Sequence, residues 1–297
     1  MAQITAADVK KLREATGAGM MDCKKALNEV DGNFDAAIDF LRTKGLAAAS
    51  KKADRVAAEG MVATLSDGTA SVVLEVNSET DFVSKNDQFV AFVNAIATLI
   101  LEKRPAGVDA LKALPFTGDL NVEQSLSQLI ATIGENMSIR RFAVLEVAGA
   151  VSAYVHGAGK IGVLVALKGE NNDALQEIAR GVAMHVAAVN PMFVSRAEVT
   201  EDAIERERQV LTDRALESGK PAAIVEKIVA GQMQKFYSEN CLLDQSFVMD
   251  SDVTVAQAIA AAQAGAELTG MVRFALGEGI EKEESDFAAE VAAQVKG

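Results

Sequence analysis

The chain of 297 residues has no Trp, two Tyr and only four Pro, while Ala is abundant. Such a composition favours helices joined by modest sheets over an all-β sandwich. Basic residues are outnumbered, because 29 Lys and Arg stand against 42 Asp and Glu, giving a formal net charge of -13. Phosphate groups bind to basic surfaces, so this balance argues against a general binder of nucleic acid or of anionic membranes.

Cysteine and long apolar runs are also scarce. Cys23 and Cys241 lie far apart without the spacing of metal ligands, which favours two reduced thiols in a cytoplasmic protein over a disulfide. Residues 1–5 lack a basic region followed by an apolar run, so we expect no signal peptide. The longest apolar runs, such as residues 161–167, are too short to cross a bilayer.

Motifs for covalent chemistry are missing. The sequence has no phosphate-binding loop of the nucleotide hydrolases, no dinucleotide glycine fingerprint, no zinc-protease helix and no recognisable nucleophile frame. Residues 157–160, Gly-Ala-Gly-Lys, look like a phosphate cradle, but the pattern predicts a hairpin turn there, without a helix N-terminus. We therefore predict a protein that is not an enzyme and has no cofactor or metal.

The most informative stretch is residues 77–86. An alternating apolar run at 72–76 predicts a buried strand before it, and apolar residues at helical spacing predict a helix after it, with Ser84 and Asp87 as its capping box. Four residues remain on the strand-to-helix turn: Thr80, Asp81, Phe82 and Val83. Phe82 either folds back as a plug under the sheet or forms a tip that faces a partner.

Residues 1–54 predict a small unit of three helices, the third of which ends at Gly45 before a basic linker. Met20 and Met21 follow a glycine-bearing loop, and two consecutive side chains of one helix cannot both face the same core. We expect one of them to be an exposed binding residue, although a small core could hold both. The pattern resembles ubiquitin-associated domains, which supports a fold and a habit of binding partners but does not fix a function.

A repeat appears after residue 55. The hairpin pattern of residues 60–76 recurs at 149–165, and the offset of 89 continues into the following helices, where Phe89 matches Ile178. The repeat predicts an α+β core of two related halves, residues 55–148 for the first and 149–196 with 241–279 for the second. His156 in the second hairpin is plain turn chemistry or a catalytic base.

Residues 197–240 predict an antiparallel coiled-coil hairpin, because two arms with narrow apolar stripes flank a turn. Beyond it, residues 245–250 predict a short strand or extended segment, and residues 270–276 a strand that rejoins the second half. Residues 280–297 predict a C-terminal helical module with its helix at 286–295.

Several motifs together resemble the bacterial translation elongation factor Ts family along essentially the whole chain. They are residues 16–27, Thr80-Asp81-Phe82-Val83, Ile133-Gly134-Glu135-Asn136, His156-Gly157 with residues 161–164, Phe247-Val248-Met249 and Gly277-Glu278-Gly279. The resemblance implies a guanine-nucleotide exchange factor that binds elongation factor Tu, a GTPase, and contacts neither nucleic acid nor membrane directly. It also implies the fold, with a ubiquitin-associated-like N-terminal domain, a duplicated core, a coiled coil and a C-terminal module.

The resemblance assigns roles to residues as well. It implies that Phe82, with Asp81, wedges between helices of the GTPase and shifts the elements that hold Mg²⁺ and the β-phosphate. The remaining contacts that it implies are Met20, Met21 and Lys24 on the nucleotide-binding domain, Thr80 and Val83 in the turn, Ile133 and Gly134 near the wedge, and His156, Val248 and Met249 in the second half. Ser84 and Lys160 stand where the family often has Ala and Arg, which leaves the wedge intact.

Two rival interpretations remain. One is a ubiquitin-type adaptor that works through residues 1–54, which leaves the duplicated core and the coiled coil unexplained. The other is an enzyme that uses the cleft between the two halves, with His156 and Asp81 as acid and base. Such an enzyme would show saturable turnover by the chain alone.

Overall fold

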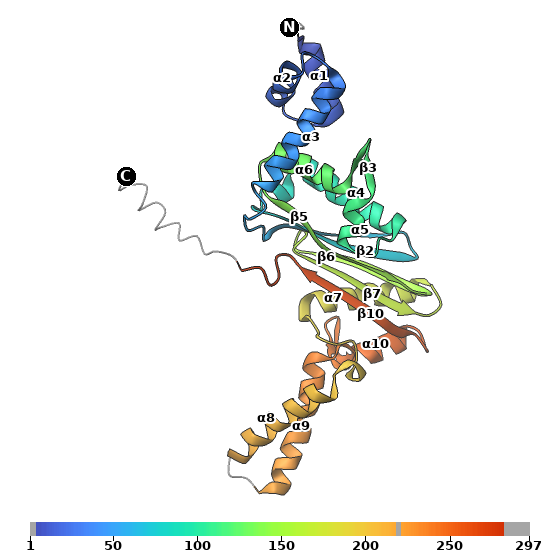
Figure 1. The fold of residues 1–297 in the computed structure, drawn as a ribbon. Helices are drawn as coiled ribbons and strands as arrows, with labels where there is room; N and C mark the ends of the chain where they lie inside the picture. Colours follow the sequence, from blue (N-terminus) through green and yellow to red (C-terminus); the bar gives the residue numbers. More distant parts are fainter. Residues whose placement is uncertain (1–3, 218–220, 282–297) are drawn as a thin grey trace. The chain divides into compact units, whose positions relative to one another are not determined.

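The structure is a computed structural model that describes residues 4–217 and 221–281 (Figure 1). Within these residues the chain forms two compact units. The first unit comprises residues up to 63 with 74–142 and 275 onward, and the second comprises 64–73 with 143–274. The division into five domains stays a prediction, and the helix predicted at 286–295, with most of the C-terminal module, lies outside the described residues.

Three helices open the first unit, as predicted: α1 (Ala6–Thr16), α2 (Met20–Glu29) and α3 (Phe34–Ser50). Thr5 caps α1 in a capping box with Asp8, and Gly17 ends that helix in the left-handed conformation with φ 67°. Apolar side chains from all three helices form a small core of Val9, Leu12, Cys23, Ala26, Leu27, Ala37 and Leu41.

The prediction that the third helix ends at Gly45 is wrong, because α3 runs on to Ser50. A glycine inside a helix is costly but tolerated where packing supports it. Gly45 is buried against α6 (Val122–Ile133), and a Cβ atom at this position would lie 3.6 Å from the carbonyl oxygen of Ser127. Contact with α6 thus keeps the helix continuous through the residue that should have ended it.

One three-stranded sheet has the order β1-β2-β5 and is formed by β1 (Glu59–Ser66), β2 (Ala70–Ser78) and β5 (Met137–Glu146). Every residue of the central strand β2 is buried. Helices α4 (Asp87–Lys103) and α6 cover one face of this sheet (Figure 1). Gly60 of β1 has φ 115°, and a Cβ atom there would lie 2.2 Å from the carbonyl oxygen of Val76 in β2. The close approach of these two strands therefore requires glycine.

Helix α4 begins two residues later than the predicted capping box of Ser84 and Asp87 requires. Its cap is Asn86, whose Oδ1 accepts hydrogen bonds from the Gln88 and Phe89 amides at 2.9 and 3.3 Å. Ser84 instead donates to the Asp81 carbonyl within the preceding turn. Asparagine caps a helix as well as serine does, and two candidates so close together compete.

A short insertion between α4 and α6 was not predicted. It consists of α5 (Val108–Ala113) and a hairpin of β3 (Pro115–Thr117) and β4 (Leu120–Asn121). Gly118, with φ 56°, makes the hairpin turn. Asn121, the last residue of β4, also caps α6 in a capping box with Gln124, so α6 begins immediately after the insertion.

The second unit repeats the plan. Strands β6 (Gly149–His156) and β7 (Ile161–Lys168) pair antiparallel, and β10 (Glu267–Ala275) adds to β7, which confirms the predicted return of the chain to this sheet. Helix α7 (Asp173–Val189) packs on β6 and β7 and buries Val182 and Val186 against them.

The offset of 89 holds for the first strands but not for the helices. Asn86 and Asn172 cap the two helices, and Arg104 and Asn190 end them with φ 49° and 53°, so both pairs are 86 residues apart. The buried faces follow the same offset. The cause lies in the loop before each helix, which has eight residues (79–86) after β2 and four (169–172) after β7.

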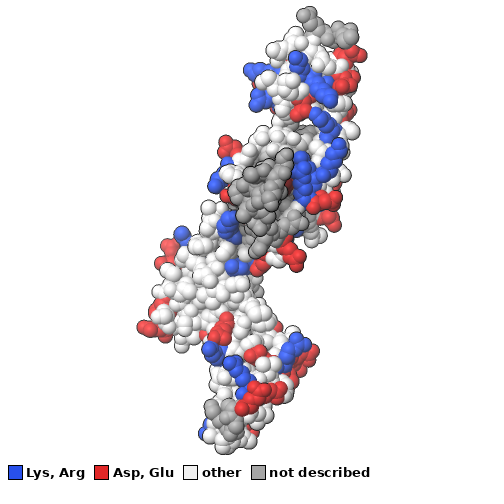
Figure 2. Space-filling model, turned by 90° about the vertical axis from the view of Figure 1, so that its left-hand side faces the viewer, with Lys and Arg blue, Asp and Glu red and all other residues white. Residues whose placement is uncertain are grey.

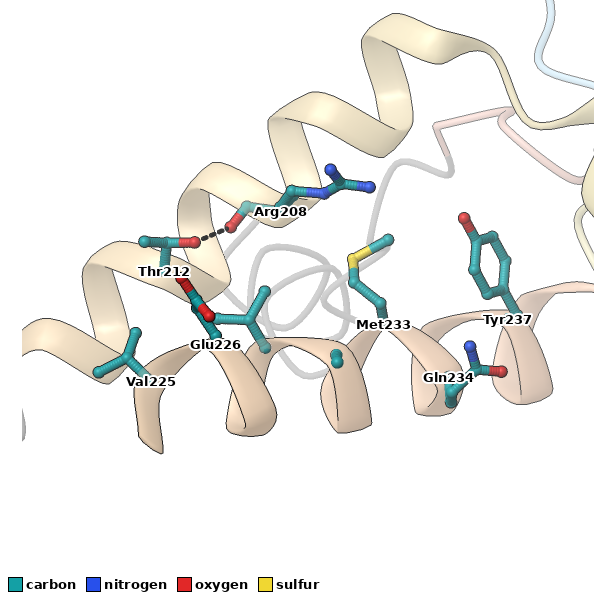
Figure 3. Close-up of a pocket in the computed structure, with 9 residues that line it drawn as sticks. Arg208, Thr212, Val225, Glu226, Met233, Gln234 and Tyr237 are labelled. Carbon is teal, nitrogen blue, oxygen red and sulfur yellow. Dashed lines mark hydrogen bonds between the residues drawn. The ribbon is translucent and has the colours of Figure 1, made fainter. Parts of the chain in front are cut away.

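Between α7 and β10 the second unit carries a helical hairpin of α8 (Glu201–Glu217) and α9 (Ala222–Asn240), side by side in Figure 1 as predicted for a coiled coil. Its seam contains Leu211, Val225, Val229 and Met233, together with partly buried side chains. A pocket of about 520 Å³ lies along this seam. Figure 3 shows Met233 and Tyr237 directed into the space between the two helices.

The shorter elements of the second unit lie before α8 and after α9 in the chain. They are η2 (Arg196–Glu198), η3 (Leu242–Asp244), β8 (Ser246–Phe247), β9 (Asp250–Thr254) and α10 (Val255–Ala262). Phe247 is buried under α7, where a Cβ atom at Gly181 would lie 2.9 Å from its ring. Strands β8 and β9 form a tight hairpin, so the segment predicted as extended turns sharply after Phe247.

One fully buried carboxylate, that of Glu75 in β2, secures the end of the described chain to the first unit. It accepts hydrogen bonds from Arg140 Nη1 at 3.0 Å, Arg141 Nε at 2.6 Å and the Gly277 amide at 2.8 Å. Arg141 also pairs with Glu278. Burial alone would raise the pKa of Glu75, but the hydrogen bonds from Gly277, Arg141 and Arg140 outweigh it and hold the pKa below its usual value.

We expect Glu75→Gln to lower the free energy of unfolding at neutral pH by about 3 kcal/mol, because two arginines lose their buried counter-charge. The depressed pKa of Glu75 means that its contribution is present above the unfolded pKa and is lost as the pH falls through the folded one. Urea unfolding of both proteins over a pH series measures this. The exposed Glu102→Gln serves as control, and equal stability of the Glu75 variant and wild type would contradict the prediction.

Candidate functional site

Phe82 lies on the loop between β2 and α4 with 78% of its surface exposed, so it is not a plug under its own sheet. The next residue, Val83, is buried at 4% and starts the short helix η1 (Val83–Lys85). The Lys85 amide donates to the Phe82 carbonyl at 3.2 Å, and the Asn86 amide to the Val83 carbonyl at 2.9 Å. The ring therefore projects from a bend whose C-terminal side is held by these two hydrogen bonds and by the buried side chain of Val83.

The other side of the bend is attached to the loop that follows α6. Both oxygens of Glu135 accept from Thr80, one from its amide at 3.0 Å and one from its hydroxyl at 2.7 Å. In return, Glu79 accepts from the Asn136 amide. We call these four residues, Glu79, Thr80, Glu135 and Asn136, the carboxylate clasp. It brings Ile133 and Gly134, which end α6, to the Phe82 loop.

The carboxylate clasp also reaches the segment that follows α3. Asn136 Nδ2 donates to the carbonyl of Arg55 at 2.7 Å and to that of Ala53 at 3.4 Å. The Arg55 guanidinium in turn lies 3.5 Å from Glu79. Three segments far apart in the sequence are thus connected around the base of the Phe82 loop.

Asp81 sits beside the exposed ring. Its backbone carbonyl accepts from Ser84 Oγ at 2.6 Å, and its side chain is exposed. Among the described residues, the Asp81 carboxylate has no hydrogen-bond or ion-pair partner. An aromatic face next to a free negative charge can contact an apolar groove that carries a hydrogen-bond donor or a cation at its rim.

A second exposed group lies on α2. Met20 and Met21 are 60% and 74% exposed, so neither belongs to the core, although the residue pattern alone had left that open. The core face of this helix is supplied by Cys23, Ala26 and Leu27 instead. Lys24 is exposed one turn after Met20, which places a cation beside the two flexible thioether side chains.

The second unit presents two further groups. His156 ends β6 and is exposed, and its Nδ1 lies 3.0 Å from the hydroxyl of Tyr154. Val248 and Met249, 48% and 63% exposed, form the turn between β8 and β9. The structure thus presents every predicted contact residue outside its cores except Val83, which is buried and supports the loop from below.

The turn that carries Val248 and Met249 is held by a buried histidine. His185 is fully buried, its Nδ1 accepts from the Val248 amide at 3.2 Å, and its Nε2 lies 2.8 Å from Gln245 Oε1. Because Nδ1 accepts from a backbone amide, the proton of the neutral ring is on Nε2 and donates to Gln245. Burial lowers the pKa of His185, and the hydrogen bond to Gln245 offsets this only in part.

Features that would indicate another kind of site are weak. In the described part of the chain, no group of three His, Cys, Asp or Glu side chains could hold a metal ion. Nor does any helix there have the length and apolarity needed to cross a membrane. Cys23 and Cys241 are buried free thiols, and burial raises the pKa of both. On the face drawn in Figure 2, acidic and basic side chains are interspersed.

Sequence reasoning missed three residues that support the candidate contacts. Glu135 appears in the sequence analysis only within a motif, and nothing in the sequence singles out Tyr154 or His185 as a support. No periodicity shows that the Glu135 carboxylate binds Thr80, 55 residues earlier in the chain. For His185, no pattern in the sequence indicates the hydrogen bond that its ring accepts from the Val248 amide, 63 residues later in the chain.

Comparison with known proteins gives one consistent result. The model of the family described as Elongation factor TS matches residues 79–278. A protein of Paramagnetospirillum magneticum named elongation factor Ts is 56% identical over 306 residues, covering 99% of this chain and 98% of its own length. Those of Rhodospirillum rubrum and Syntrophotalea carbinolica are 55% and 52% identical, and the alignments cover 100% and 99% of this chain and 100% of each relative.

The buried His185 predicts a pH dependence of stability. Because its folded pKa is depressed, we expect the chain to lose stability as the pH falls below about 6.5, by at most about 1.4 kcal/mol per pH unit. Urea unfolding of wild type and His185→Gln between about pH 7.5 and 5.5 measures this. The stability difference between the two proteins should shrink at the lower pH, and a constant difference would contradict the prediction.

Proposed function

Because this chain belongs to the elongation factor Ts family, the guanine-nucleotide exchange factors of elongation factor Tu, we propose that it opens the nucleotide site of that GTPase with the exposed ring of Phe82. Such a factor makes and breaks no covalent bond, so the chain is not an enzyme in that sense. Translation elongation places this activity in the cytoplasm.

Exchange follows from thermodynamic linkage. A factor that binds the nucleotide-free GTPase more tightly than the nucleotide-bound form must weaken nucleotide binding by the same ratio. The ring of Phe82 supplies the differential contact if the groove that receives it opens only when the elements around Mg²⁺ and the β-phosphate move. An acceleration of about a thousandfold requires about 4 kcal/mol. Burial of one aromatic side chain contributes about 1.5–3 kcal/mol, and lost Mg²⁺ contacts contribute the rest.

The single observation that carries this proposal is a large apolar ring, 78% exposed, on a bend that is fixed at both ends. Water disfavours such a ring, and a fixed bend keeps it from folding back. A preorganised ring also loses little conformational freedom when it enters a groove, so more of its burial free energy is left to open the GTPase.

The other exposed groups would hold the GTPase while the ring acts. We assign Met20, Met21 and Lys24 to its nucleotide-binding domain. Asp81, Ile133 and Gly134 contact the GTPase beside the ring, Thr80 supports the loop through its hydrogen bonds to Glu135, and His156, Val248 and Met249 contact the GTPase from the second unit. Flexible thioether side chains adapt to an apolar partner surface, and they contribute affinity to every state of the complex.

We expect Phe82→Ala to slow GDP release at saturating factor by about 30-fold, equivalent to about 2 kcal/mol, because the ring acts in the opened state. Stopped-flow release of fluorescent GDP from elongation factor Tu measures the rate. The matched control is Met192→Ala, which removes another exposed apolar side chain, 69% exposed, outside the assigned contacts. A release rate like that of wild type would rule out the wedge.

The double variant Met20→Asp with Met21→Asp should behave differently. We expect the factor concentration for half-maximal exchange to rise at least about tenfold, with little change in the rate at saturation, because these side chains bind without opening the site. Titration of exchange rate against factor concentration separates the two quantities. Met192→Asp is the control for an added charge, and an unchanged half-maximal concentration would remove the α2 contact from the proposal.

A further inference from the structure

The Phe82 loop is an addition to the repeated plan. Residues 79–86 connect β2 to α4, whereas four residues, 169–172, suffice to connect β7 to α7. The shorter connection leads directly into its helix through the cap of Asn172. A longer loop has more conformations, so the position of the ring depends on whatever restrains the added residues.

The restraint on the strand side of the ring is concentrated at Thr80. All three of its polar groups are engaged, since its amide and hydroxyl donate to Glu135 and its carbonyl accepts from Ser78 Oγ at 2.9 Å. Thr80 lies two residues before the ring. A two-point attachment to one carboxylate fixes the direction in which the chain enters the bend, which a single hydrogen bond would leave free to rotate.

We propose that Glu135 is a positioning residue of nucleotide exchange, which holds the bend so that the Phe82 ring is presented to the GTPase in one orientation. This inference rests on the proposed function of Phe82. Both Glu135 oxygens accept hydrogen bonds from Thr80, at 2.7 and 3.0 Å, which ties Glu135 to the loop that carries the ring, and we assign its role to this contact. It is therefore distinct from the contact residues assigned above.

The clasp also indicates that Glu135 can be removed without loss of the fold. Glu79 makes the reciprocal hydrogen bond to the Asn136 amide, and Asn136 Nδ2 remains bonded to Arg55. The bend itself keeps its buried Val83 and the cap of Asn86. Loss of Glu135 therefore loosens one end of the loop while the two loops stay adjacent.

The test compares Glu135→Ala with wild type in GDP release from elongation factor Tu. A loosened bend presents the ring correctly only part of the time, so the rate at saturating factor should fall about tenfold. The half-maximal concentration should change less than about threefold, because the contact residues are intact. Glu102→Ala, an exposed glutamate on α4, is the matched control, and thermal unfolding checks the fold.

Thr80 gives a second, smaller change to the same contact. Thr80→Val removes the hydroxyl donor but keeps the amide, and should lower the saturated rate in the same direction. Thr80→Ser restores the hydroxyl and should recover the wild-type rate. A role in general packing would respond the other way, since valine preserves the shape of threonine and serine does not.

A double-mutant cycle decides whether Glu135 works through the ring. In the Phe82→Ala background, Glu135→Ala should have no further effect on the saturated rate. Full additivity of the two effects would overturn the inference, and so would a wild-type rate for Glu135→Ala beside a slow Phe82→Ala. If Phe82→Ala itself releases GDP at the wild-type rate, the proposed function fails first, so the two failures are distinguishable.

Discussion

An aromatic ring stays in water only if the chain beneath it cannot rearrange to bury it. In this protein the constraint is met by a loop that is fixed at three points: the Thr80–Glu135 hydrogen bonds, the buried Val83 and the Asn86 cap. None of these contacts involves the ring itself. The exposure of the aromatic ring therefore depends on polar and packing contacts of its neighbours. The sheet and helices of the first unit hold these neighbouring residues in place.

The duplicated core separates what is structural from what is functional. The two halves share glycines at the start of the first strand, asparagine caps and left-handed residues at the helix ends, all of which the fold requires. They differ in the loop before the helix, where only the first half carries added residues and an exposed ring. The second half instead presents its apolar tip on a later hairpin, above His185. The candidate contacts thus lie on loops that differ between the two halves, while the strands and helices beneath these loops are shared.

Much of this architecture could be predicted from periodicity and turn residues. The three N-terminal helices, both hairpins and the coiled coil follow from apolar spacing. Gly45 could not be read correctly, because contact with α6 outweighs the tendency of a glycine to end a helix. The helix offset of 86 was missed for a related reason, since an alignment of apolar positions tolerates a shift of three residues along a helix face.

The candidate site was predictable in part. Spacing placed Phe82 on a turn but could not tell a buried ring from an exposed one, because both occur after a buried strand. The partners that decide it, Glu135 and Asn136, lie more than 50 residues away in sequence. Long-range polar contacts leave no periodic pattern in the sequence. The family resemblance therefore assigned both loops to one contact surface, and only the structure shows the hydrogen bonds that connect them.

The hydrogen bond from Gly277 to Glu75 has a consequence for the order in which the protein is made. Synthesis proceeds from the N-terminus, so β2 emerges from the ribosome 202 residues before the amide that completes the shell around its buried carboxylate. Arg140 and Arg141 arrive earlier and neutralise the charge, yet the shell stays open until the chain is nearly finished. The first unit therefore begins to form early in translation and reaches its final stability only near the end of synthesis.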